Sequence, residues 1–204
     1  MNSNISWLAM LAVFSGLSVN LILQFGIGLE QITVNSQFHK KKILPGLGIL
    51  VVTVLLLWLV FTLIRSMLFT GLLEYVLLFP ASYLIYSMLS VSLDYCRNRF
   101  ISGKTEMEES LSGSLLTGGI MSGAALFVTL NIAGNFRETL VLSLGFAAGI
   151  WLAVAITGEI RLRSGMEAVP RFLRGGPLAL IAMGLLSLVF TSAALMLYQV
   201  LGAK

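Results

Sequence analysis

Polar side chains and glycines gather at two places inside long apolar stretches of the chain, and they are the residues best suited to do chemistry. The first place holds Asn20, Gln24, Gly26 and Gly28, and the second holds Thr117, Gly118, Gly119 and Asn131. Glycine frees the backbone from regular helix, and a polar group at membrane depth needs a partner. These two segments are therefore candidates for broken helices that line an ion path.

A broken helix inside a membrane is tolerated only where protein or a water-filled cavity covers the freed backbone. We therefore expect the two segments to meet near the centre of the molecule. The alternative is that the glycines allow ordinary helices to pack closely, as small residues four positions apart do. Gly119 and Gly123 have that spacing. From the spacing of residues, both interpretations stay open.

Asp94 is a further candidate, because it directly follows an apolar run and precedes Tyr95, Cys96 and Arg97. Its carboxylate could pair with a neighbouring arginine at the end of a helix. Alternatively, a partly desolvated carboxylate could serve as a step in a cation path. The sequence contains a single cysteine, Cys96, and a single histidine, His39, so it offers few thiolate and imidazole ligands for a metal site. No nucleophile triad or phosphate-binding loop is present, so we expect no catalysis by this chain alone.

The composition indicates an integral membrane protein. Of the 204 residues, 57% are hydrophobic and 11% are charged, and the mean hydropathy is +0.95. One soluble core cannot bury so many apolar side chains, so lipid must be their solvent. We expect a single transmembrane domain over residues 1–204. The net charge of +4 comes from connecting loops and does not indicate binding to nucleic acid.

Crossing about 30 Å of hydrocarbon takes roughly 20 apolar residues. Six stretches meet this requirement approximately, at residues 7–29, 43–64, 67–93, 111–133, 139–158 and 177–201. We interpret the first as a retained span, because it lacks the basic start and the small-residue cleavage site of a signal peptide. The boundary between the second and third is the weakest, since little more than Arg65 and Ser66 separates them.

Basic residues divide unequally between the two sets of alternating loops. The connectors after the first, third and fifth stretches hold Lys40, Lys41, Lys42, Arg97, Arg99, Lys104, Arg161, Arg163, Arg171 and Arg174. The opposite side holds Arg65, Arg137 and Lys204. Because basic loops stay in the cytoplasm, both termini are expected outside, in a bacterial or archaeal inner membrane.

Short segments in the first half of the chain also resemble segments in the second half, at a spacing close to 97 residues. Leu47-Gly48 matches Leu144-Gly145, and the glycine of Gly16-Leu17-Ser18 matches that of Gly113-Ser114-Leu115. Two repeats of three spans, at about 1–96 and 110–204, would have to insert with opposite orientation. We therefore expect an all-α protein made of two inverted three-helix repeats, each with a broken first helix.

Several short motifs resemble one known family of membrane proteins. The most specific lie near the C-terminus, at residues 169–175 (VPRFLRG) and 179–188 (ALIAMGLLSL). Less specific ones are Val19-Asn20, Ser92-Leu93-Asp94-Tyr95, Leu130-Asn131, Asn135-Phe136 and Ile160-Arg161. Together they are similar to the RnfA and NqrE type subunits shared by the Rnf complex and the sodium-pumping NADH:quinone reductase.

This resemblance implies six spans in inverted repeats, outward termini and a homologous partner subunit of opposite topology. It also implies a cysteine at the break of each repeat, and these cysteines of the two subunits together hold a 2Fe-2S cluster. This sequence departs from the pattern there. Glu30 follows Gly28-Leu29 where the family has a cysteine, and Ile120 follows Gly118-Gly119 at the second position. Neither residue supplies a thiolate, so we expect no cluster on this chain.

The hypothesis is therefore a membrane subunit of an Rnf-like ion-translocating oxidoreductase, contributing scaffold or part of an ion path. Flavin and iron-sulfur centres would belong to partner subunits, and this chain would itself be at most a non-catalytic subunit. A small permease or substrate-capture subunit is the alternative, with a site around Asn20, Gln24, Thr117 and Asn131. A scaffold without any ligand is a third possibility.

Overall fold

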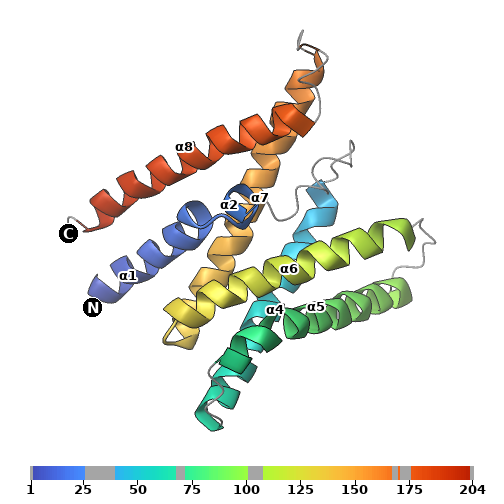
Figure 1. Ribbon diagram of the computed structural model, residues 1–204, viewed down its shortest axis with the longest axis vertical. Helices are drawn as coiled ribbons and strands as arrows, with labels where there is room; N and C mark the ends of the chain where they lie inside the picture. Colours follow the sequence, from blue (N-terminus) through green and yellow to red (C-terminus); the bar gives the residue numbers. More distant parts are fainter. Residues whose placement is uncertain are drawn as a thin grey trace. The chain divides into compact units, whose positions relative to one another are not determined.

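The computed structural model describes residues 2–25, 40–67, 72–100, 108–166, 170 and 176–202. Regular secondary structure within these residues is entirely helical, as expected (Figure 1). The elements are α1 (Asn2–Val13), the π-helix η1 (Phe14–Ser18), α2 (Leu21–Phe25), α4 (Lys40–Met67), α5 (Leu72–Phe100), α6 (Glu108–Ile132), α7 (Phe136–Met166) and α8 (Gly176–Gly202).

Four of these helical segments are long and apolar enough to cross a membrane. They are Ser6–Leu23, Gly46–Arg65, Phe136–Ile160 and Leu180–Val200. Two shorter apolar helices, Val76–Ser92 and Gly118–Ile132, lie within the third and fourth expected spans. The helical class is thus confirmed, whereas six spans and their inverted repeat stay predictions.

Large apolar side chains are exposed along these helices. Met88 on α5 and Leu188 and Met196 on α8 are among the most exposed, at about 70%. A soluble protein keeps few such side chains in contiguous exposed patches. Their exposure agrees with lipid as the solvent.

Two helices extend beyond the apolar stretches that predicted them. α5 continues to Phe100 and α7 to Met166, although the expected spans end at residues 93 and 158. Apolar character marks contact with hydrocarbon, whereas the helix ends where its backbone hydrogen bonds end. Cys96, which follows the end of the expected third span, therefore lies within α5.

By its internal contacts the chain divides into two compact units, Met1–Leu44 with Leu144–Lys204, and Pro45–Ser143. In the second unit, α5 and α6 run side by side (Figure 1). Leu57 and Phe61 of α4 join Leu78 of α5 and Leu126 of α6 in a buried apolar cluster.

The glycines of α6 face the aromatic side chains of α5. A Cβ atom added at Gly118 would overlap the Tyr86 ring, and one at Gly119 would lie 3.0 Å from Cα of Tyr83. At Gly123 an added Cβ would lie 2.7 Å from Oγ of Ser82. These glycines therefore let the two helices approach closely, which is the packing role that we weighed as the alternative to a break.

The expected break in the fourth span is absent, because α6 is one continuous α-helix through Thr117, Gly118 and Gly119. Packing against α5 supports the backbone at these glycines, and tertiary packing routinely overrides weak helix propensity. In lipid, an opened backbone would also lose hydrogen bonds that no water replaces. The prediction of a broken helix at this place was wrong.

α6 and α7 are joined by a short turn. The backbone N–H of Gly134 donates to Oε2 of Glu138 at 2.8 Å, and that of Ala133 donates to the carbonyl of Thr129 at 2.8 Å. Glu138 lies in the first turn of α7, where the helix dipole favours a carboxylate.

In the first unit, α8 packs along α1, η1 and α2. Leu21 and Ile22 of α2 are fully buried there. The described part of the first apolar stretch, up to residue 25, is thus not one helix but three consecutive pieces, and this interruption defines the candidate site.

Candidate functional site at the break in the first span

The first span changes helix type before it breaks. After Val13 the backbone widens into the π-helix η1, and the N–H of Val19 donates to the carbonyl of Phe14 five residues earlier at 2.8 Å. Val19 has φ −114° and ψ 59°, outside the helical region, and α2 begins two residues later at Leu21. Such π-helical turns occur mostly as short insertions, frequently at functional sites.

Asn20 lies at the break and is 1% exposed. Its Oδ1 accepts hydrogen bonds from the backbone N–H groups of Ile22 at 3.2 Å and Leu23 at 3.3 Å. Asn20 therefore caps the N-terminus of α2, where the first N–H groups have no carbonyl partner within the helix.

The amide nitrogen of Asn20 makes the remaining contacts. Its Nδ2 donates to the carbonyl of Gly149 on α7 at 2.8 Å and to that of Gly16 in η1 at 3.3 Å. One side chain thus joins the two pieces of the broken span to each other and to α7. Asn20, a residue predicted from sequence, lies at the centre of this site.

Glycines of α7 permit this close contact. A Cβ added at Gly149 would overlap the carbonyl of Gly16, and one at Gly145 would overlap Oγ of Ser15. The hydroxyl of Ser15 points toward the preceding helical turn, where it donates to the carbonyls of Leu11 at 3.0 Å and Ala12 at 3.3 Å. The backbone of η1 therefore crosses α7 where α7 has no side chains.

Ser15, Gly145 and Gly149 were not among the site residues predicted from the sequence. The signal that could have found the last two is their Gly-x-x-x-Gly spacing in an apolar helix, which is typical of close helix crossings. No sequence signal indicates which helix such a pair will contact, because that depends on the tertiary arrangement.

Tyr198 of α8 borders the break on another side. Its buried hydroxyl lies beside the side chain of Ser18, the last residue of η1. The surroundings of the break are thus mainly backbone, amide and hydroxyl groups without a charged side chain among these contacts.

For most of the other predicted site residues, the structure describes no side-chain contacts. Gln24, Thr117 and Asp94 lie in α2, α6 and α5, within parts of these helices where only the backbone is described. Gly26, Gly28 and Glu30 lie outside the described residues. Asn131 is exposed near the end of α6, where its Nδ2 donates to the carbonyl of Phe127 at 2.7 Å.

Asn20 and Asn131 belong to different compact units. The structure therefore brings Asn20 together with Gly16 and Gly149, whereas the expected meeting of the first and fourth spans stays a prediction.

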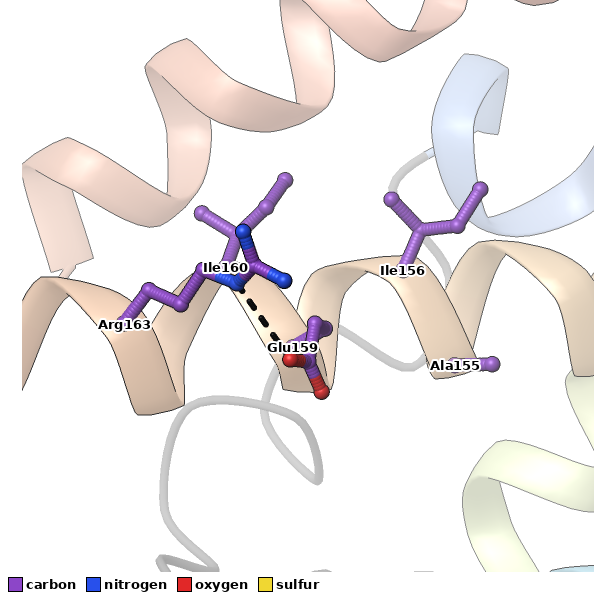
Figure 2. Close-up of a pocket in the computed structure, with 5 residues that line it drawn as sticks. All are labelled: Ala155, Ile156, Glu159, Ile160 and Arg163. Atoms are coloured by element: carbon purple, nitrogen blue, oxygen red, sulfur yellow. Dashed lines mark hydrogen bonds and ion pairs between the residues drawn. The ribbon is translucent and has the colours of Figure 1, made fainter.

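An open hollow lies on the surface of α7 (Figure 2). It is lined by Ala155, Ile156, Glu159, Ile160 and Arg163. Nε of Arg163 and Oε1 of Glu159 form an ion pair at 3.3 Å, one turn apart, and both side chains are more than half exposed. Because all lining residues belong to one helix, the hollow cannot enclose a ligand, and such an exposed pair contributes little.

A 2Fe-2S cluster of the kind that the family resemblance implies needs thiolate ligands. Ile120 occupies one family position with an exposed hydrocarbon side chain. The one cysteine lies in α5. Among the described residues, no group of three or more His, Cys, Asp or Glu side chains could hold a metal ion.

Apolar helices of spanning length, exposed apolar side chains and a polar break inside the first span define a multi-pass helical membrane protein. No protein-family model matches the chain.

A stretch of 56 residues, 28% of this chain, is 41% identical to a subunit of the Na(+)-translocating ferredoxin:NAD(+) oxidoreductase complex of Acetobacterium woodii. The matched stretch spans 29% of the length of that relative. This partial similarity supports a relationship to the Rnf-type membrane subunits that the sequence motifs resemble.

Proposed function

We propose that this chain is a membrane subunit of an Rnf-like, ion-translocating redox complex, in which it provides scaffold or part of an ion path. The observation that carries the proposal is the 41% identity over 56 residues to a subunit of a sodium-translocating ferredoxin:NAD(+) oxidoreductase. The apolar helices and the break in the first span support it, because interrupted helices in membrane proteins commonly surround ion pathways.

Membership of a complex is tested by purification. An affinity-tagged chain expressed from its native locus, extracted in a mild detergent, should co-purify with other Rnf-like subunits. Among them we expect a homologous membrane subunit of opposite topology, together with subunits that carry flavin or iron-sulfur centres. A monodisperse chain recovered alone under several mild detergents would contradict the proposal.

The chain is proposed to hold no 2Fe-2S cluster of its own, because Glu30 and Ile120 occupy the family's cysteine positions. Iron analysis and visible absorption of the isolated chain should give no stoichiometric iron. The positive control is the same measurement on a relative that has both cysteines. Two iron atoms per chain, or per pair of chains, would mean that these positions are wrongly aligned.

A small permease or substrate-capture subunit is a second candidate. The observation in its favour is the discontinuous first span, a feature of transporters whose sites lie near the middle of the membrane. Neighbouring genes discriminate between the two: genes for flavin or iron-sulfur subunits favour the redox complex, and a transport ATPase or an isolated gene favours the permease.

A pure scaffold is separated from both by substitution of the polar candidates. Asn131→Leu should leave assembly and activity unchanged for a scaffold, because the Asn131 side chain is exposed near the end of α6. For an ion path or a substrate site that includes Asn131, the same substitution should lower the transport rate without lowering the amount of assembled protein.

A further inference from the structure

Asn20 has no hydrogen-bonding capacity left for a ligand. A side-chain amide offers two N–H donors and one carbonyl oxygen with two lone pairs. The donors reach the carbonyls of Gly16 and Gly149, and the oxygen accepts from Ile22 and Leu23. An ion coordinated by Asn20 would have to displace the cap of α2, leaving buried N–H groups without partners.

The contact with α7 depends on glycine at position 149. The nearest heavy atoms to an added Cβ would be the carbonyl oxygen and carbon of Gly16 and its Cα. Even one methyl group there would separate η1 from α7 and lengthen the bond from Nδ2 of Asn20 to the carbonyl of Gly149, now 2.8 Å.

We infer that Asn20 is a positioning residue that clasps the broken first span to α7 through the Gly149 carbonyl, and that it does not ligate a transported ion. The Asn20 clasp comprises Asn20, Gly16 and Gly149. It fixes where η1 ends and where α2 begins relative to α7. This inference goes beyond the proposed function and does not depend on it, because every contact lies within one chain.

The clasp performs two separable tasks. Oδ1 caps α2, and Nδ2 ties the break to α7. Serine is a strong N-cap residue but is too short to reach the Gly149 carbonyl, so Asn20→Ser should keep the cap and lose the tie. Asn20→Leu should lose both.

Amide hydrogen exchange of the full chain in detergent micelles tests the cap. With Asn20→Leu, the segment 21–25 should exchange about threefold to tenfold faster, the range that corresponds to one net hydrogen bond. With Asn20→Ser, its exchange should stay within about twofold of the original chain, because serine restores the cap. Equal acceleration by serine and leucine would overturn the assignment of Oδ1 as the cap.

A double-mutant cycle in equilibrium unfolding tests the tie. Asn20→Ser and Gly149→Ala should each lower the unfolding free energy, but their combination should lower it no further than the larger single effect, since both remove the same contact. Gly158→Ala is the matched control in α7, because an added Cβ there meets no atom within 4 Å. Its effect should add to that of Asn20→Ser.

Two outcomes would overturn the inference. One is full additivity of Asn20→Ser with Gly149→Ala. The other is stabilisation of the original chain by sodium chloride relative to choline chloride that disappears in Asn20→Ser but persists in Gly149→Ala, because that pattern belongs to a ligand. If Gly149→Ala fails to fold, the sodium comparison between Asn20→Ser and the original chain still decides between clasp and ligand. Failure to co-purify with redox subunits would contradict the proposed function, but it would not change the outcome of the hydrogen-exchange, unfolding and sodium experiments.

Discussion

Hydroxyl side chains inside the helices mostly bond to carbonyls of their own helix. Thr53, Thr129 and Thr157 each donate to the carbonyl four residues earlier, at 2.6 to 2.8 Å. Such bonds satisfy a buried polar group without joining helices. Ser82 differs, because its Oγ lies 2.8 Å from the carbonyl of Phe79 and also 3.1 Å from that of Gly119 on α6.

We predict that Ser82→Ala destabilises the α5 and α6 pair by about 0.6 kcal/mol, and by no more than about 1.7 kcal/mol, the range of hydrogen bonds between membrane helices. Equilibrium unfolding in mixed micelles measures this change. The matched control is Ser90→Ala, since Oγ of Ser90 donates within α5 to the carbonyl of Ser87 at 2.8 Å. A larger effect at Ser90 than at Ser82 would contradict the proposed bond between helices.

The polar candidates illustrate what residue types do and do not reveal. Asn20 was predicted because an amide in an apolar stretch needs partners, and the structure supplies four of them. The residue type alone could not predict which groups these partners are, since one of them is the carbonyl of Gly149, 129 positions away in the sequence. It also could not distinguish a ligand from a cap, because both use the same oxygen.

The described glycines of α6 do not interrupt their helix. In α6, Gly118, Gly119 and Gly123 lie against α5 within an unbroken helix. In the first span, the backbone opens at Val19 and Asn20, neither of which is glycine. At the described glycines of α6 the sequence therefore marks close packing, whereas Gly26 and Gly28 of the first span lie outside the described residues.

We predict that Gly119→Ala destabilises the α5 and α6 pair by about 1 to 3 kcal/mol, the usual cost of an overpacked contact. Its Cβ would lie 3.0 Å from Cα of Tyr83, a backbone atom that cannot move unless the helix moves. Equilibrium unfolding should detect this change, with the distance between spin labels on α5 and α6 as a second readout.

Gly48→Ala on α4 is the control for that substitution, because nothing lies within 4 Å of its added Cβ. Relative to glycine, alanine favours a helix interior by roughly 0.5 to 1 kcal/mol, so Gly48→Ala should be neutral or stabilising. If both substitutions had the same sign and size, close contact would not explain the glycine at position 119.

Orientation in the membrane is a property of the whole chain. Ten basic residues follow the first, third and fifth apolar stretches of the sequence, and three lie on the opposite side, which predicts that both termini face the non-cytoplasmic side. Fusion of a periplasm-dependent reporter enzyme to each terminus should give activity at both ends, and a cytoplasm-dependent fluorescent reporter should give none. Activity of the fluorescent reporter at either terminus would contradict the predicted topology.

The division into two compact units was not foreseen. One unit combines the N-terminal span with α7 from Leu144 and with α8, whereas the other is continuous in sequence from Pro45 to Ser143. The repeats predicted at about 1–96 and 110–204 do not coincide with these units. A sequence repeat is defined by the similarity of two segments, whereas a compact unit is defined by the contacts between segments. The two divisions of a chain therefore need not agree.

Composition and apolar stretches were sufficient for the class of this protein, because lipid requires long apolar helices whatever the details of their contacts. The sequence likewise identified Asn20 as a polar residue that needs partners. Tertiary contacts decided the rest: α5 keeps the glycines of α6 in a continuous helix, and the bare backbone of α7 at Gly149 receives the break of the first span. These outcomes depend on which surfaces meet, and a local pattern of residues does not contain that information.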